Sequence, residues 1–206
     1  MITFRALRHR RPPAHAAGVA AGGFTLIELM VTIAVAAIML SIAAPGMTRL
    51  IGSNRIQTEA SGFVADMQYA RTEAIRRGYN VTVCPSSNGT SCLTANTWHS
   101  GWMVFSDRGT TGVFDAASSD TMLRLRKAFT NSDTAVAYVG SSAAAPTNNY
   151  ITFNREGFAS GPGTGTAIMK FNLSSNDVKS KRCVAIDLAG RLTTLVDGGS
   201  SMGAGC

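Results

Sequence analysis

The hydrophobic pattern divides the chain into a leader, a long apolar run, a helical stripe and a strand-rich remainder. Residues 24–44 are almost all apolar, and Glu28 is the one charged residue among them. A helix of that length measures about 32 Å, close to the roughly 30 Å of hydrocarbon in a bilayer. We therefore predict that residues 24–44 form a membrane-spanning helix.

Beyond the apolar run, hydrophobic residues recur every three or four positions, which is the spacing of one face of a helix. These residues are Ile56, Ala60, Phe63, Met67, Ala70 and Ala74. Pro45 stands at the junction and lacks a backbone donor, so a bend of the helix is predicted there. One helix is thus predicted over residues 24–77, and its amphipathic half, residues 45–77, is expected to pack on a domain.

Charged residues occupy the other faces of this predicted helix and are expected to be solvated. They are Arg55, Glu59, Asp66, Arg71, Glu73, Arg76 and Arg77. The basic pair at the end, followed by Gly78, is typical of the carboxyl terminus of a helix.

From residue 78 onward the pattern changes to short β-rich runs separated by Gly, Ser, Asn and Thr, which predicts antiparallel strands. The predicted strands are residues 80–84, 101–106, 122–129, 135–139, 150–153, 167–173, 183–188 and 191–196. Gly109, Gly157 and Gly190 stand where a tight reversal requires a positive φ. The predicted fold class is α+β: a long amino-terminal helix packed on an antiparallel β-sheet domain formed by residues 78–206.

The charge distribution predicts the orientation in the membrane. The chain has 19 Lys and Arg against 12 Asp and Glu, a formal net charge of +7. Four arginines lie in residues 1–23, which contain no acid. Because basic residues flanking a span stay in the cytoplasm, the leader is predicted to be cytoplasmic and residues 45–206 to lie outside. The alternative is a secretory signal cleaved near Ala43, which would release a soluble secreted protein.

The start of the apolar run carries a specific motif. Residues 23–31 read GFTLIELMV, which resembles the class III signal of type IV pilins and type II secretion pseudopilins. The resemblance implies that a prepilin peptidase cuts after Gly23, that the new terminal residue Phe24 is N-methylated, and that Glu28 guides docking of the subunit in a filament. Pro45 matches the helix-kinking proline of these proteins.

A carboxylate inside a membrane costs about 2.5 to 3.5 kcal/mol near the centre, so a partner is expected for Glu28. Cleavage after Gly23 would place a new amino group at the same depth, and the two charges could pair between subunits. The alternative is that the Glu28 side chain extends to the lipid headgroups.

Three further segments resemble the GspH/FimT-like family of minor pilins and pseudopilins: residues 70–77 (ARTEAIRR), 98–107 and 153–157 (FNREG). The resemblance implies a non-enzymatic subunit, without a cofactor, in the filament of a type II secretion system or a type IV pilus. It implies a single-pass protein of the bacterial inner membrane with a periplasmic domain. The implied partners are other pilins or pseudopilins, the prepilin peptidase/N-methyltransferase and the inner-membrane assembly platform.

A DNA-binding competence pilin is the alternative function. Lys181, Arg182 and Arg191 are the candidate phosphate contacts. Some FimT-like members bind DNA through a Gly-Arg-x-Arg element, but residues 190–193 read GRLT here, so the second arginine is missing.

All four cysteines lie on the side predicted to be outside the cytoplasm, where disulfides form. Of three possible pairings we favour Cys84 with Cys92, which closes a polar loop, and Cys183 with Cys206, which ties the chain end to a strand. A zinc site is the alternative, but the sequence has no C-x-x-C pair and offers only His99 beyond the leader.

Motifs of catalysis are missing from the sequence, which has no G-x-S-x-G elbow, H-E-x-x-H helix or P-loop. His99 stands beside a tryptophan and is predicted to be structural. Asp107, Asp115 and Asp120 lack the spacing of a calcium-binding EF-hand and are predicted to be turn residues. We therefore expect neither an enzyme nor a metal site.

Overall fold

The computed structural model describes residues 23–139, 149–161, 169–175 and 180–196, without the side chains of residues 44, 45 and 196. Contacts divide the chain into two compact units, Met1–Ala43 and Ala44–Cys206. In the part that the structure describes, the first unit is helical from Leu26 onward, and every strand belongs to the second.

Helix α1 (Leu26–Arg77) has 52 residues and confirms the predicted helix to within two residues at its start. It ends because Gly78 adopts a φ of 74°, and its amide donates to the carbonyl of Ala74 at 2.9 Å. A left-handed glycine at this place is the common stop signal of an α-helix. The assigned helix continues through Pro45, and the bend there stays a prediction.

Nine strands and two short 3₁₀ helices follow α1 in the described residues. They are β1 (Val81–Pro85), η1 (Trp98–Ser100), β2 (Trp102–Ser106), η2 (Ala116–Ser118), β3 (Thr121–Arg126), β4 (Thr134–Tyr138), β5 (Ile151–Phe153), β6 (Ala159–Ser160), β7 (Met169–Ser174), β8 (Lys181–Ile186) and β9 (Leu192–Val196). All eight predicted strands are present with shifted ends. The two-residue strand β6 was not predicted, because so short a run has no periodicity to detect.

The strands form two antiparallel sheets, whereas the sequence pattern predicted only a single sheet domain. The first sheet has the order β3-β2-β1-β5-β6 and the second has the order β4-β7-β8-β9. β4 follows β3 in the chain but pairs with β7, from Thr134 opposite Ser174 to Tyr138 opposite Lys170. A period-two pattern marks which residues share a face and does not specify which strand pairs with which.

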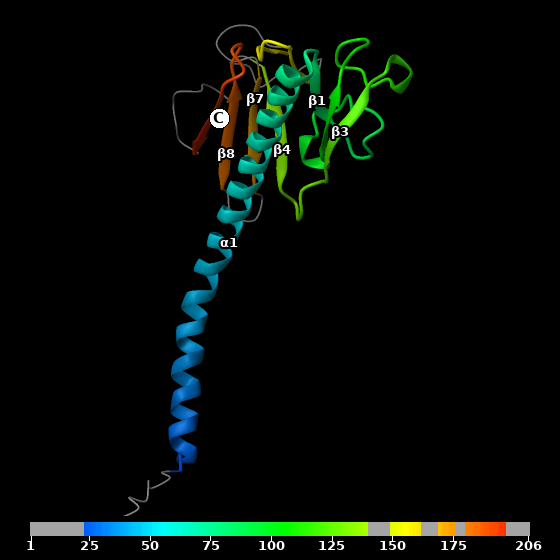
Figure 1. Cartoon of the computed structure of the whole chain (residues 1–206). Coiled ribbons are helices and arrows are strands. Elements are labelled where there is room, and N and C mark those ends of the chain that lie inside the picture. The colour runs from blue at the N-terminus through cyan, green and yellow to red at the C-terminus, as the bar shows by residue number, and fades with distance from the viewer. Residues whose placement is uncertain (1–22, 140–148, 162–168, 176–179, 197–206) are drawn as a thin grey trace, which may run out of the picture. The chain divides into compact units, whose positions relative to one another are not determined.

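The main core lies between α1 and both sheets. All six residues of the predicted helical stripe are at most 1% exposed, which confirms that stripe. Phe63 is central, with its ring centroid 5.8 Å from that of Trp98, 5.2 Å from Trp102 and 4.4 Å from Phe171. Figure 1 shows the cyan end of α1 lying along β7, β8 and β4. The helix therefore joins the two sheets into one core.

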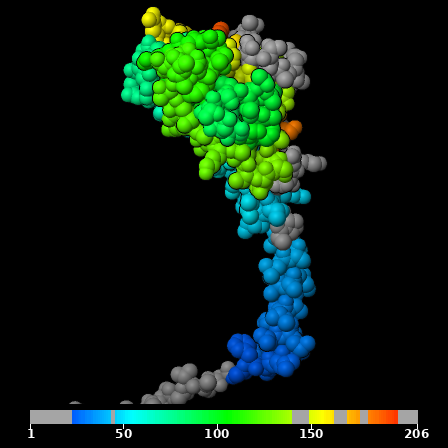
Figure 2. Space-filling model, turned by 90° about the vertical axis from the view of Figure 1, so that its right-hand side faces the viewer, coloured from blue at the N-terminus to red at the C-terminus, as the bar shows by residue number. Residues whose placement is uncertain are grey.

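A second, smaller core lies on the other face of the first sheet. Val83 belongs to the main core, whereas its neighbour Cys84 packs with Met103 and Phe105, because successive strand residues point to opposite faces. The connection from β1 to η1 and the β2–β3 connection contribute Cys92 and Phe114 to this cluster. Figure 2 shows the segments between β1 and β4, in green, forming the surface on this side.

Two of the three predicted turn glycines have a positive φ, Gly157 at 83° and Gly190 at 72°. Gly109 does not, and Gly112 at 82° takes that role instead. The reason is that residues 107–120 form a longer loop that contains η2 rather than a tight reversal. A Cβ on Gly112 would lie 2.2 Å from the ring of Tyr150, so a larger residue does not fit.

The outer edge of β4 is covered by side chains. The Asn96 amide donates to the carbonyl of Ala137 and accepts from its N–H, both at 2.7 Å. His99 Nδ1 lies 3.3 Å from the carbonyl oxygen of Ala135, in agreement with its predicted structural role. Because these groups occupy the backbone of β4, another strand cannot add at this edge.

Candidate functional site

The amino-terminal segment of the described chain begins with a capped helix. Helix α1 starts at Leu26, and the hydroxyl of Thr25 accepts a hydrogen bond from the amide of Glu28 at 3.2 Å. Thr25 is thus the cap, and Glu28 is the third helical residue, the spacing of a capping box. An acid in the first turn also interacts favourably with the helix dipole. The signal of this cap, Thr-x-x-Glu, is present in the sequence at residues 25–28 but was not among the predicted features.

The side chains of this segment are apolar and exposed in the single chain. Phe24 is 83% exposed, Leu26 77% and Ile27 64%. The hydroxyls of Thr32 and Ser41 donate to the carbonyls three residues earlier at 2.8 and 2.7 Å, so these donors are bonded within the helix. By length and composition α1 includes the one stretch among the described residues that is apolar enough to cross a membrane.

Glu28 is the exception in this apolar surface. Within the described residues its side chain is exposed and makes no hydrogen bond or ion pair. Gly23 and Phe24 precede the helix and are exposed as well. Residues 1–22, the rest of the predicted leader, lie outside the described residues, and the roles predicted for Gly23, Phe24 and Glu28 stay predictions.

Five of the seven helix charges expected to be solvated are buried or half-buried, which corrects that expectation, whereas Arg76 and Arg77 are exposed as expected. Arg71 donates from Nε to the carbonyl of Gly157 at 2.9 Å and from a terminal nitrogen to that of Ala189 at 3.0 Å. These carbonyls belong to the β5–β6 and β8–β9 turns, one from each sheet. The Ala159 amide adds a bond to the carbonyl of Leu188 at 3.0 Å. Arg71 therefore fastens both sheets to α1.

Asp66 is a second buried charge, with an exposure of 3%. It accepts from the indole of Trp102 at 3.1 Å and from the guanidinium of Arg124 at 2.7 Å. Arg124 in turn lies 3.9 Å from the ring centroid of Tyr69. These contacts connect α1 to β2 and β3. The helical periodicity did not predict these contacts, because it reports the average polarity of each helix face and not the partner of a single charged residue.

Two further acids, Asp133 and Glu73, form ion pairs with arginines of α1. Arg55 binds Asp133 through two bonds of 2.5 and 2.8 Å and Ser175 at 3.2 Å. Glu73 is 7% exposed and accepts from Arg76 and Arg77. Hydrogen bonds from Arg76 and then Arg77 lower the pKa of Glu73 below its usual range.

The three candidate DNA contacts do not form one patch. Lys181 and Arg182 are in the first residues of β8, and Arg191 follows the opposite end of that strand. Arg182 precedes Asp187 by five residue steps along the strand, a span of about 17 Å. Arg182 donates to Gln57 at 2.6 Å, and Arg191 forms an ion pair with Asp187 at 2.8 Å. Two of the three cations are thus engaged within the domain.

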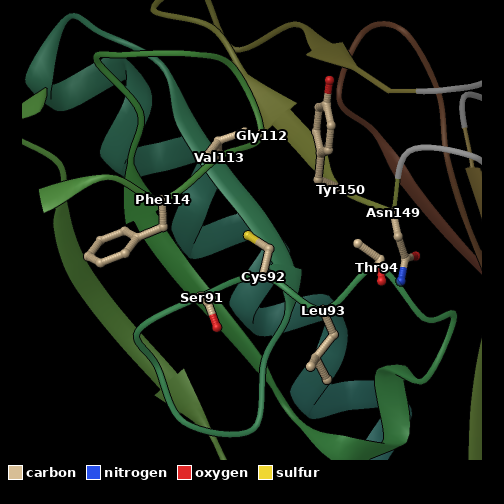
Figure 3. A pocket seen from close by; sticks show the side chains of 9 residues that line it. All are labelled: Ser91, Cys92, Leu93, Thr94, Gly112, Val113, Phe114, Asn149 and Tyr150. Atoms are coloured by element: carbon tan, nitrogen blue, oxygen red, sulfur yellow. The ribbon is translucent and has the colours of Figure 1, made fainter.

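The Cys84–Cys92 disulfide is present, as predicted, with Cα atoms 5.6 Å apart. Its sequence separation of 8 residues corresponds to a stabilisation of about 2.5 kcal/mol by loop entropy. Cys183 on β8 is also disulfide-bonded, but Cys206 lies outside the described residues, so their pairing stays a prediction. Figure 3 shows Cys92, Phe114 and Tyr150 lining a hollow between the disulfide loop and the β2–β3 connection.

The acids of the β2–β3 connection hold the loop itself. Asp107 accepts from Thr82 and from the amide of Gly112, and Asp120 accepts from two loop amides. Asp115 caps η2. Across the described ranges no group of three or more His, Cys, Asp or Glu is arranged to hold a metal ion. The structure agrees with their prediction as turn residues.

Comparisons with known proteins bear on both parts of the chain. A family model described as type II transport protein GspH matches residues 59–190. A model of the prokaryotic N-terminal methylation motif matches residues 20–44. No curated protein matches the sequence significantly.

Solved structures that resemble this one come from two bacteria. The type IV minor pilin FimU of Pseudomonas aeruginosa is 19% identical, with 69% of this chain and 89% of that chain covered and a TM-score of 0.48. The minor pseudopilin EpsH from the type 2 secretion system of Vibrio cholerae is 13% identical, with 70% and 98% covered and a TM-score of 0.41.

Proposed function

The chain belongs to the GspH family of type II transport proteins and is pilin-like, and from this premise we propose that it is a minor, non-enzymatic subunit of a pilus-like filament. The filament is that of a type II secretion system or of a type IV pilus. One observation carries the proposal. The apolar residues at the start of α1 are exposed, and Glu28 is the acid among them, without a partner in the described residues. A folded GspH domain follows this apolar segment in the chain. Such a helix needs a bilayer or neighbouring helices around it.

Maturation follows from the methylation motif. We propose that residues 1–23 are a cytoplasmic leader, that a prepilin peptidase/N-methyltransferase removes it after Gly23, and that Phe24 is then methylated. Residues 24–44 anchor the subunit in the inner membrane, and residues 45–77 and 78–206 form the amphipathic half-helix and the periplasmic domain. The match of the motif to residues 20–44 supports this division.

Assembly is proposed to use the charge of Glu28. When the subunit leaves the membrane at the assembly platform, the apolar helix packs against helices of other pilins or pseudopilins. In that low dielectric an unpaired carboxylate is costly, whereas pairing with the free amino terminus of a neighbour offsets the cost. The hydrogen bond from the Glu28 amide to the Thr25 hydroxyl orders the first turn of the helix and therefore the position of Glu28 along the helix axis.

Replacing Glu28 with alanine is expected to leave cleavage intact and to reduce the filament-bound fraction at least tenfold. The reason is that an amino terminus of the neighbour then loses its counter-charge in an apolar surrounding. Mass spectrometry of the purified protein gives the mature start, and immunoblots of membrane and sheared-filament fractions give the incorporation. Glu59→Ala, on the same helix, is the matched control. Normal incorporation of Glu28→Ala would refute the docking role, and a mature start near residue 44 would refute retention of the helix.

The proteins that a deletion strain fails to export or assemble show whether the subunit belongs to a type II secretion system or to a type IV pilus. Quantitative mass spectrometry of the medium and of sheared filaments is expected to show a loss of several exported proteins with pili unchanged, because the matched family is a type II transport family. Loss of the major pilin with export unchanged would instead assign the protein to a type IV pilus. Complementation with the unaltered gene is the control.

DNA binding is not favoured by the positions of the candidate cations. Duplex binding needs several cations that face successive phosphates, whereas Arg191 is paired with Asp187 and lies at the other end of β8 from Lys181 and Arg182. The filament subunit therefore stands as the proposed function.

A further inference from the structure

A hollow lies in the second unit, directly after the carboxyl end of α1. It is lined by the residues that follow the helix, by the start of the β2–β3 connection and by the β5–β6 turn. The lining side chains that carry hydrogen-bond donors are those of Tyr79, Asn80, Arg108, Asn154 and Arg155, and the lining carboxylates are Asp107 and Glu156. The residues that line this hollow belong neither to the main core, nor to the disulfide, nor to the proposed membrane helix. These features therefore do not explain why the donors lie together.

Tyr79 is the centre of these donors. The guanidinium carbon of Arg108 lies 4.1 Å from the centroid of the Tyr79 ring, and Arg77 donates to the Tyr79 hydroxyl at 3.2 Å. Because the hydroxyl oxygen accepts from Arg77, its own hydrogen is available for donation. The hydrogen bond from Arg77, together with Arg108, lowers the pKa of Tyr79, which reports a positive surrounding.

Two of the acids near the hollow, Glu73 and Glu156, are bound by arginines of their own chain. Glu73 accepts from two arginines of α1, and Glu156 binds Arg155 at 3.2 Å and the amide of Asn154 at 2.8 Å. Asp107 is 3% exposed, and one of its oxygens accepts from the backbone of Gly112 at 2.8 Å while the other has no described partner. Arg155 is paired with Glu156, whereas Arg108 forms no ion pair with any of the described residues.

Asn80 adds a further group without a partner. Its backbone carbonyl accepts from the amide of Asp107 at 2.9 Å, which fixes it beside Arg108. Its side-chain amide has no hydrogen bond to any of the described residues. The hollow therefore presents a guanidinium, a phenolic hydrogen and an amide, which together are donors suited to one oxyanion.

We propose that this hollow binds a carboxylate of a neighbouring protein subunit, with Arg108 as the charged partner and Tyr79 and Asn80 as additional donors. The proposal rests on the proposed filament function, because it requires a neighbour. Arginine pairs with a carboxylate through parallel hydrogen bonds, and the neighbour's acid takes the place of water in the hollow.

The number of cations favours a protein over a polyanion. Of the two arginines that line the hollow, Arg155 is paired with Glu156 and Arg108 has no acidic partner among the described residues, whereas nucleic acid binding uses rows of cations. A lipid surface fits less well, because residues 44–77 of α1 cover about 50 Å along the helix before the hollow is reached. A single carboxylate balances the one positive charge of Arg108, and its two oxygens can accept hydrogen bonds from Arg108, Tyr79 and Asn80.

Chemical coupling in native filaments tests the proposal. Arg108→Lys places a primary amine in the hollow, and a carbodiimide then joins that amine to a carboxylate in contact. Arg191→Lys is the matched control, because Arg191 is exposed and already paired with Asp187 of its own chain. Both variants are checked for the Cys84–Cys92 disulfide and for an unchanged thermal transition before use.

We expect Arg108→Lys to couple to an Asp or Glu peptide of another subunit at least five times more than Arg191→Lys. We also expect Arg108→Glu to reduce incorporation about tenfold, the size of a lost charge-assisted contact, and Arg191→Glu to leave it unchanged. Coupling only within the chain, coupling to lipid or nucleic acid, or native incorporation of Arg108→Glu would overturn the proposal. Absence of the unaltered protein from filaments would refute the proposed function itself. If the unaltered protein is present in filaments, a negative result with the Arg108 variants refutes the carboxylate site alone.

Discussion

Replacing Arg71 with methionine is expected to lower the free energy of unfolding of the domain by about 3 kcal/mol. Two charge-assisted bonds to the carbonyls of Gly157 and Ala189 are lost, and each is worth roughly 1.5 to 3 kcal/mol. Methionine keeps most of the aliphatic length, so the packing loss is small. Denaturant unfolding of the full chain in detergent, followed by the fluorescence of the two buried tryptophans, measures the change.

The control for this prediction is Arg191→Met, in the β8–β9 turn that Arg71 holds. The Arg191 side chain is 78% exposed, and an exposed ion pair contributes at most about 1 kcal/mol. A result in which both variants lose equal stability would contradict the role of Arg71 in joining the sheets. Because the apolar core around Phe63 still joins α1 to both sheets, Arg71→Met is also expected to preserve a single cooperative transition at a lower denaturant concentration.

Asp66→Ala is expected to destabilise the domain by about 2 to 3 kcal/mol, because it leaves a buried donor unpaired and removes the acid that binds an arginine whose side chain is 44% exposed. Arg124 would lose its acid, and the indole of Trp102 would be left as a buried donor without an acceptor. The same fluorescence-detected unfolding measures the effect, with the emission maximum of the folded state as a second observable for the surroundings of Trp102.

Asp66→Asn is the informative companion variant, because asparagine keeps an acceptor for Trp102 and removes only the charge. Its loss of stability should be about half that of alanine, since one of two interactions remains. Asp187→Ala, in the β8–β9 turn, is the control, with an expected change of about 1 kcal/mol, because its charged partner Arg191 is 78% exposed. Equal and small effects of Asp66→Ala and Asp187→Ala would show that burial of Asp66 is unimportant for stability.

The local pattern of the sequence determined the helix and the positions of the strands. The apolar run, the stripe from Ile56 to Ala74 and the stop at Gly78 each depend on residues within a few positions, and all three match α1. The short polar loop between Cys84 and Cys92 also predicted its disulfide. The residues from Gly23 to Val31 indicated the N-terminal methylation motif that the comparisons show, and the segments at residues 70–77, 98–107 and 153–157 indicated the GspH family.

The tertiary structure alone decided the partners of the charges. Arg71 appeared to lie on a solvated face, yet its acceptors are 86 and 118 residues away, and Asp66 meets Arg124 across 58 residues. Likewise, Tyr79 and Arg108 came together only through the pairing of β1 with β2. Periodicity records which residues share a face of one element, whereas the contacts of a charge depend on how elements pair, and that pairing results from packing of the whole core.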